Sequence, residues 1–200
     1  MMESVSSSTN DYMSAWKAFE ENCRSCNACG LRSSVNNVVI FRGARNAPLM
    51  VIGEAPGEEE DKQGLPFVGK SGQLLQNLLN SFGIDESICH ICNIVKCRPP
   101  ENRRPESTEI AACKRHLASQ FKLVRPKVIL LCGSTAYEAF FGVKPVMKEV
   151  RGTVIQKNGF HIITTFHPAY ALRNEAGKAP IYDDVKLVKN KLIELGCINP

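Results

Sequence analysis

Short aliphatic runs rich in β-branched residues alternate with segments of helical period along most of the chain, and this alternation limits the fold more than any other feature. Strands are predicted for NNVVIF (36–41), PLMVIG (48–53), 88–95, KVILLCG (127–133) and the two halves of TVIQKNGFHIITTF (153–166), which the Asn158-Gly159 turn joins as a hairpin. Helices are predicted over 12–23, 71–82, 107–124, 134–140 and 181–195. Such an order predicts a three-layer α/β/α fold around a mainly parallel central sheet.

The length and composition fit one globular domain. Of 200 residues, 44% are hydrophobic and 22% are charged, which is ordinary for a chain with one sizeable core. The first ten residues are polar and rich in serine, so we expect disorder over 1–10 and one folded domain over 11–200. The apolar runs are too short to cross a bilayer, and the N-terminus lacks the apolar core of a signal peptide. We therefore expect a cytoplasmic protein without membrane contact.

Nine cysteines are many for such a chain. Their odd number and the expected reducing compartment favour metal binding over a disulfide framework. Cys26-x-x-Cys29 lies in a loop, where two thiolates three residues apart can face one ion or cluster. With Cys97 and Cys113 they make a four-cysteine set, which suits zinc or an iron-sulfur cluster alike. Two alternatives remain open, because Cys23 could replace Cys29 as the partner of Cys26, and Cys113 could be an apolar residue of a helix face.

Three polar segments follow predicted strands. They are GEAPGEEEDKQGLPFVGKSG (53–72), NIVKCRPPENRRP (93–105) and HPAYALR (167–173). Because ligands of such sheets bind outside the carboxyl ends of the strands, we expect these segments to converge on one site. We expect the first to be a long irregular loop, which is typical of a functional segment. In the second segment, the prolines prevent a continuing strand or helix. Its arginines could bind phosphate, although a solvated basic face would have the same composition.

These segments, with the Cys26-x-x-Cys29 pair upstream and Cys113 downstream, resemble the iron-sulfur (family 4) uracil-DNA glycosylases of the uracil-DNA glycosylase superfamily. The likeness runs from about Cys26 to about Arg173, with several motifs in the family's order and spacing. It implies a monomeric DNA repair enzyme that flips uracil out of single- or double-stranded DNA, hydrolyses the N-glycosidic bond and leaves an abasic site. It also implies a [4Fe-4S] cluster held by Cys26, Cys29, Cys97 and Cys113. A sliding clamp is a candidate partner, and a prokaryotic protein would be associated with the nucleoid.

The resemblance implies roles for residues of a uracil pocket. His167 matches the second catalytic motif of the family, where a neutral imidazole N–H could stabilise the departing uracil anion. Asn93 matches the uracil-reading position, because a carboxamide can accept from uracil N3–H and donate to O4. Phe67 matches the ring on which uracil stacks. Glu54 is expected to position water or stabilise the cationic sugar, and Glu60 to wall the pocket against the methyl group of thymine.

One position departs from the best-studied branch of the superfamily. The water-activating aspartate of that branch has no counterpart here, since the position is Ala55, which we also expect at the uracil pocket. The group that activates water therefore stays open. Glycines and a helix N-terminus would bring backbone amides to phosphates, and an arginine would enter the duplex. The expected DNA-binding residues are Gly69, Ser71, Gly72, Arg98 and Arg173.

Two rival functions remain open at this point. One is a non-enzymatic iron-sulfur module that binds nucleic acid and keeps the pocket as a recognition surface. The other is a glycosylase that acts mainly on another damaged base or bonds covalently to DNA. The segment after Asn93 lacks the His-bearing basic insertion associated with covalent bonding to DNA. No lysine stands out as a Schiff-base nucleophile, so strand cleavage is not expected.

Overall fold

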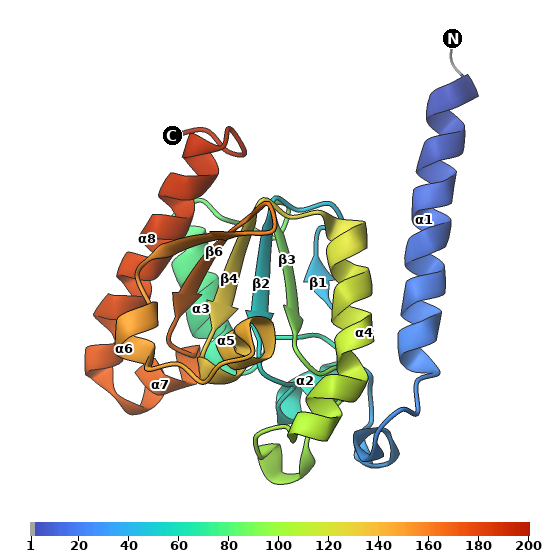
Figure 1. Cartoon of the computed structure of the whole chain (residues 1–200), viewed down its shortest axis with the longest axis horizontal. Helices are drawn as coiled ribbons and strands as arrows, with labels where there is room; N and C mark the ends of the chain where they lie inside the picture. The colour runs from blue at the N-terminus through green and yellow to red at the C-terminus, as the bar shows by residue number, and fades with distance from the viewer. Residues whose placement is uncertain (1–2) are drawn as a thin grey trace.

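The structure, a computed structural model, describes residues 3–200, and side chains from residue 10 onward. A six-stranded sheet in the order β1-β3-β2-β4-β6-β5 lies between two layers of helices (Figure 1). The strands are β1 (Arg42–Gly43), β2 (Leu49–Gly53), β3 (Cys89–Asn93), β4 (Val128–Cys132), β5 (Val154–Lys157) and β6 (Phe160–Thr165). The α-helices are α1 (Glu3–Arg24), α2 (Glu58–Gln63), α3 (Lys70–Ser81), α4 (Ser107–Val124), α5 (Ser134–Phe141), α6 (Met147–Val150), α7 (Pro168–Arg173) and α8 (Lys178–Glu194).

The sheet is mixed but mostly parallel. Strands β3, β2, β4 and β6 run parallel, while β1 and β5 pair antiparallel at the two edges. This arrangement confirms the predicted α/β/α fold with a mainly parallel sheet. None of the helices over residues 3–200 is both long and apolar enough to cross a membrane.

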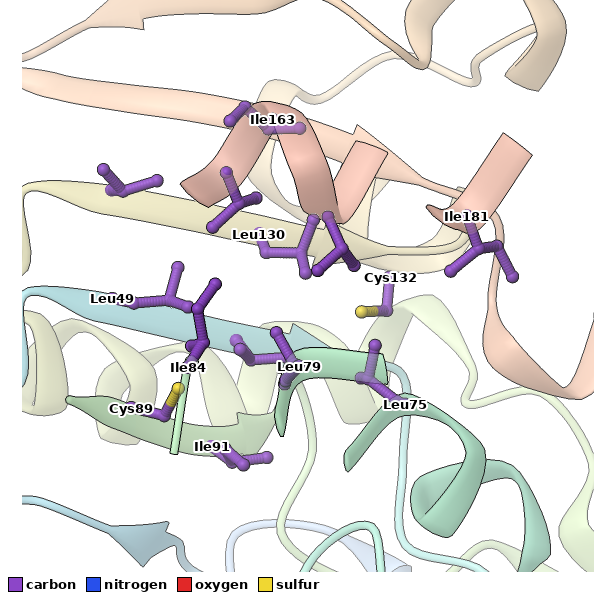
Figure 2. Close-up of a cluster of buried hydrophobic side chains, with 14 of the residues drawn as sticks. Leu49, Leu75, Leu79, Ile84, Cys89, Ile91, Leu130, Cys132, Ile163 and Ile181 are labelled. Atoms are coloured by element: carbon purple, nitrogen blue, oxygen red, sulfur yellow. The ribbon is translucent and has the colours of Figure 1, made fainter. Parts of the chain in front are cut away.

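The alternation of side chains along the strands builds a core on each face of the sheet. Leu49 and Val51 of β2 face the layer of α3 and α8, where Cys132 is also buried (Figure 2). Met50 and Ile52 face the other layer, with α4 and α5. A third cluster, around Trp16, Phe19, Ile40 and Val124, packs α1 against α4.

Several predicted elements differ from the structure. The β-branched run NNVVIF is not a strand, because the backbone N–H of Val39 donates to the carbonyl of Lys96 (2.8 Å) outside any ladder. The first helix begins at Glu3 rather than near residue 12, and the predicted disorder over 1–10 falls partly on residues 1–2, outside the described residues. The segment 53–72 contains α2, and α3 is capped by Gly69 rather than Ser71. HPAYALR contains α7, which is not among the predicted helices. That one domain spans 11–200 stays a prediction.

His90 of β3 gives the fold a pH dependence. Its ring stacks on Phe41 and bonds at both nitrogens: Nδ1 donates to the carbonyl of Ala44 (2.9 Å), and Gln120 Nε2 donates to Nε2 (3.0 Å). Burial lowers the pKa of His90 from 6.5 to about 4. Between these values the unfolded chain binds a proton that the folded chain does not, so stability falls as the pH falls.

We expect this histidine to make the protein about 2 kcal/mol less stable at pH 5 than at pH 7. Urea unfolding at both pH values measures the difference. His90→Phe keeps a stacking ring but removes the titrating group, so its stability should lack this share of the pH dependence. An equal pH dependence in both proteins would contradict the prediction.

Candidate active site

The loops that leave the carboxyl ends of β2, β3 and β6 meet around one pocket, as the sheet topology predicts. The cavity has a volume of about 480 Å³, within the range of small-molecule sites. Its lining residues are Glu54, Ala55, Pro56, Gly57, Glu60, Phe67, Ser71, Asn93, Pro99, Asn102, Arg103, His167, Ala169 and Arg173.

Most of the residues expected at the site line this pocket. They are Glu54, Ala55, Glu60, Phe67, Ser71, Asn93, His167 and Arg173. Three expected DNA-binding residues do not line it. Arg98 donates to Asn102 Oδ1 (2.7 Å), the N–H of Gly69 donates to Glu60 (2.8 Å), and Gly72 lies against the backbone of Phe67.

His167 is held in one tautomer by the first turn of α7. It is the N-cap residue of this helix, and its Nδ1 accepts from the backbone N–H of Ala169 (3.2 Å). Burial lowers the pKa of His167, while the charge of Glu54 raises it less. A neutral ring with Nδ1 as acceptor carries its proton on Nε2. The side chain therefore offers a neutral N–H donor at the pocket.

Phe67 adopts a backbone conformation that is unusual for a bulky residue. Its φ is 56°, in the left-handed region. Arg42 at the sheet edge holds the turn, because Nε donates to the carbonyl of Pro66 (2.8 Å) and an NH2 group to that of Phe67 (3.4 Å). Arg42 also forms an ion pair with Glu86. The Phe67 ring stays close to parallel with the ring of His167, with 24° between their planes and 6.3 Å between their centroids.

Asn93 ends β3 and is only 2% exposed, yet its side chain borders the pocket. Within the described part of the chain its side-chain amide makes no hydrogen bond, so both donor and acceptor stay available for a ligand. Gly53, its partner in the parallel register of β2 and β3, leaves room for it. A Cβ atom at Gly53 would lie 2.4 Å from Asn93 Oδ1 and 2.5 Å from Phe67 Cζ.

We expect Gly53→Ala to displace both the Asn93 amide and the Phe67 ring. Misplacement of a site group by about 1 Å costs roughly a hundredfold in rate, so the chemical step should slow by about that factor while the fold survives. Gly30→Ala is the matched control, because a Cβ atom there meets nothing within 4 Å. Equal single-turnover rates for the two variants would contradict this account of Gly53.

Two carboxylates of the first segment are held by different partners. Thr135, at the start of α5, donates to Glu54 Oε2 (2.5 Å), and Glu54 Oε1 has no hydrogen-bond partner among the described residues. Glu60 accepts from the N–H of Gly57 (3.1 Å) and of Gly69 (2.8 Å), so it ties the two ends of this segment together. Glu54 therefore has one carboxylate oxygen available to a ligand in the pocket, while both oxygens of Glu60 stabilise the loop.

Three further polar residues at the site were not expected from the sequence. Thr135 is 81 residues from Glu54, and no local pattern signals their contact. Asn102 and Arg103 lie in the proline segment whose arginines were expected to meet phosphate, but neither residue was expected at the pocket. The guanidinium of Arg103 is bound by both oxygens of Glu109 (2.9 and 2.6 Å), which fixes it at the rim.

The four predicted cysteine ligands line a second, smaller pocket between the N-terminal cysteine loop, the segment after β3 and α4. All four are free thiols, and Cys23, the alternative ligand, also lines this pocket. Burial raises the pKa of Cys97 to about 12 and raises that of Cys113. The donor set fits an iron-sulfur cluster, since four thiols share one pocket. Over residues 10–200, however, no group of three or more His, Cys, Asp or Glu side chains is arranged to hold a metal ion.

The sequence of the chain has clear relatives. A profile of the Uracil DNA glycosylase superfamily matches residues 40–186. The type-4 uracil-DNA glycosylase of Thermotoga maritima is 42% identical over 85% of this chain and 91% of its own length, and that of Saccharolobus solfataricus is 39% identical over 84% and 82%. The type-5 uracil-DNA glycosylase of Pyrobaculum aerophilum is 24% identical over 78% and 76%. The chain therefore belongs to the type-4 uracil-DNA glycosylases of the uracil-DNA glycosylase superfamily.

Proposed function

We propose that this protein is a monofunctional DNA repair glycosylase that excises uracil from single- or double-stranded DNA and leaves an abasic site. The observation that carries the proposal is the convergence of an aromatic ring, an unused carboxamide, a neutral imidazole N–H and a carboxylate on one pocket. The relatives bear the names of uracil-DNA glycosylases and cover most of the chain, which supports the same activity.

Base recognition rests on two side chains. A flipped uracil stacks on Phe67, and Asn93 accepts from uracil N3–H through Oδ1 and donates to O4 through Nδ2. Cytosine presents an acceptor at N3 and a donor at N4, so it meets the amide with the opposite pattern. The carboxylate of Glu60 accepts hydrogen bonds from two backbone amides, which gives this residue a structural role. Its role in excluding thymine stays a prediction.

The chemical step separates charge. Breaking the bond between the sugar C1′ and uracil N1 leaves the electron pair on uracil and a cationic sugar. The Nε2–H of His167 stabilises the developing negative charge at uracil O2. Glu54, held by Thr135 through Oε2, has Oε1 to hold the attacking water or to face the cationic sugar. Water adds its oxygen to C1′, and the proton that it loses balances the uracil anion, so that neutral uracil is released.

DNA contact involves the rim of the pocket. Ser71 lies in the first turn of α3, where free backbone N–H groups favour a phosphate. Arg173 ends α7 and is exposed, so it can enter the space that the flipped base leaves. A monomeric state, a sliding-clamp contact and a nucleoid location stay predictions.

A [4Fe-4S] cluster held by Cys26, Cys29, Cys97 and Cys113 completes the proposal. The pocket that these thiols share and the family membership support it. A cluster in this position would tie the N-terminal cysteine loop to the segment after β3 and to α4, which is a structural contribution.

Release of free uracil from single- and double-stranded oligonucleotides tests the proposed reaction. A panel of other damaged bases in the same sequence context tests the rival glycosylase. Binding to uracil-containing DNA without release of any base would favour the non-enzymatic module and reject the proposal.

Asn93→Asp tests base reading. We expect slower uracil excision and weaker discrimination against cytosine, because a protonated carboxyl group can donate where the carboxamide accepts. The ratio of kcat/KM for uracil and cytosine substrates measures both effects. Phe67→Ala serves as a comparison, because loss of stacking should weaken binding by about 1 to 3 kcal/mol without changing the preferred base. Unchanged kinetics on uracil would reject Asn93 as the reader.

A further inference from the structure

Lys96 is a lysine with almost no access to solvent. It follows β3, precedes Cys97 directly and is 2% exposed, among the largest fully buried side chains of the described part. Moving an ammonium group out of water is costly unless an anion or strong acceptors surround it. Burial of this lysine therefore needs a partner.

The one hydrogen bond that the Lys96 ammonium group makes within the described residues compensates only part of the cost of burying its charge. Its Nζ donates to the backbone carbonyl of Asn93 (2.8 Å), the residue expected to read the base. No aspartate or glutamate over residues 10–200 forms an ion pair with it. One carbonyl does not balance a whole buried charge.

Other positively charged side chains join Lys96 around the pocket of the four cysteines. Lys96 and Arg32 line it, and an NH2 group of Arg115 lies 3.2 Å from Cys26 Sγ. Among the described residues, no carboxylate lines the pocket. Within this part of the chain, the charged side chains around the thiols are thus all positive, and an anionic occupant would balance them. An iron-sulfur cluster held by four thiolates is such an anion.

Lys96 also lies on a short covalent path between the two pockets. Asn93 and Cys97 are four positions apart, and the segment between them is fixed to the end of β2. The N–H of Ile94 donates to the backbone carbonyl of Gly53 (2.9 Å), and that of Val95 donates to the backbone carbonyl of Glu54 (3.3 Å). The cysteine pocket and the base pocket are therefore joined by a short buried segment rather than by a flexible loop.

We propose that Lys96 is a positioning residue that supplies the buried counter-charge of the iron-sulfur cluster and, through its bond to the Asn93 carbonyl, holds the base-reading end of β3. The inference rests on the proposed function, since it requires both the cluster and base reading by Asn93. The ammonium group of Lys96 would have two separable effects. Its charge acts on the cluster, and its hydrogen bond to Asn93 acts on the uracil pocket.

Lys96→Met tests the charge. Methionine keeps an unbranched side chain for packing but removes the ammonium group. We expect the variant to lose iron to a chelator about 10- to 100-fold faster than the wild type, as for other groups that support metal ligands. Its cluster should also have a lower reduction potential, because the added electron loses a nearby cation. Visible absorbance follows the loss, and voltammetry gives the potential.

Lys96→Gln separates the effect of the charge from the effect of the hydrogen bond to Asn93. It also tests the loss of charge if Lys96→Met is recovered unfolded. It lacks the charge but keeps a donor for the Asn93 carbonyl, so it should lose iron quickly yet retain more of the wild-type kcat/KM than Lys96→Met. Lys114→Met is the matched control, an exposed lysine beside Cys113 whose removal should change neither property. Thermal unfolding of all variants checks the fold.

The outcomes distinguish this inference from the proposed function. Wild-type iron retention and potential in both Lys96 variants would overturn the role of Lys96 and leave the uracil activity and the cluster intact. Wild-type protein that holds no iron when prepared anaerobically would overturn the cluster and this role together. Wild-type protein that holds iron but releases no uracil would reject the proposed reaction and the base-reading half of the inference.

Discussion

His167→Ala is expected to slow single-turnover uracil excision by about a hundredfold to a thousandfold while DNA affinity changes little. The Nδ1 atom accepts from Ala169 N–H, and burial lowers the pKa of the ring, so the pocket receives a neutral Nε2–H. A donor to the uracil anion gains strength only as the glycosidic bond breaks, and its loss therefore falls on the chemical step. The expected loss corresponds to about 2.7 to 4 kcal/mol of transition-state stabilisation.

A packing role for His167 predicts a different result. The ring caps α7 through the Ala169 N–H, so its removal could loosen the loop and lower stability and affinity together. Single-turnover rates, DNA dissociation constants and iron content, measured on the same preparations, separate the two roles. His161→Ala is the control, since His161 lies in β6 outside the pocket. A loss of affinity that accounts for the whole rate defect would refute the catalytic role.

Cys97→Ala is expected to abolish the cluster and most soluble expression. Cys97 belongs to the segment after β3, whereas Cys26 and Cys29 lie in the N-terminal loop and Cys113 in α4, so one lost ligand would release three parts of the chain at once. Binding of a structural metal centre contributes directly to folding free energy, which explains the size of the expected effect. Purified wild-type protein should be brown and contain about four irons.

Cys132→Ala is the matched control for this experiment. Cys132 ends β4 in the core against α3 and α8 (Figure 2), and it does not line the cysteine pocket. Its variant should keep the cluster and lose only packing energy. Iron, sulfide and zinc analysis of anaerobic preparations measures the outcome. Stoichiometric zinc without iron in the wild type, or full iron in Cys97→Ala, would contradict the four-cysteine cluster.

Long periodic elements were predictable from the sequence because their signal is local. Helix α4 has the predicted bounds, and the Asn158-Gly159 hairpin joins β5 to β6, with both turn residues at positive φ. Short helices were not predictable, since α2 and α7 have six residues each and present too little of a helical period. The β-branched run before β1 fits a strand by composition, but tertiary contacts give its backbone another partner.

The pocket was predictable in outline because the topology of a parallel sheet brings strand ends together. His167, Asn93 and Phe67 line one cavity for this reason. The support around them was not predictable. The hydrogen bonds from Thr135 to Glu54 and from Arg42 to the Phe67 turn join residues that are distant in sequence. No local sequence pattern therefore predicts them.

The turn at Phe67 holds the stacking ring in place, so the conformational change that brings ring and base together has to come from the DNA. Its left-handed backbone is clamped by Arg42 on one side and by Gly72 on the other, where a Cβ atom would lie 2.0 Å from the Phe67 carbonyl oxygen. Because its backbone is held on both sides, we expect the Phe67 ring to keep its position, and the nucleotide then leaves the helix to reach it. Extrusion costs a few kcal/mol in a paired duplex and least where the base is mispaired or unpaired. The ease with which a base leaves its stack would then set the order in which uracils are removed, with those in wobble pairs and single strands preceding those in stable pairs.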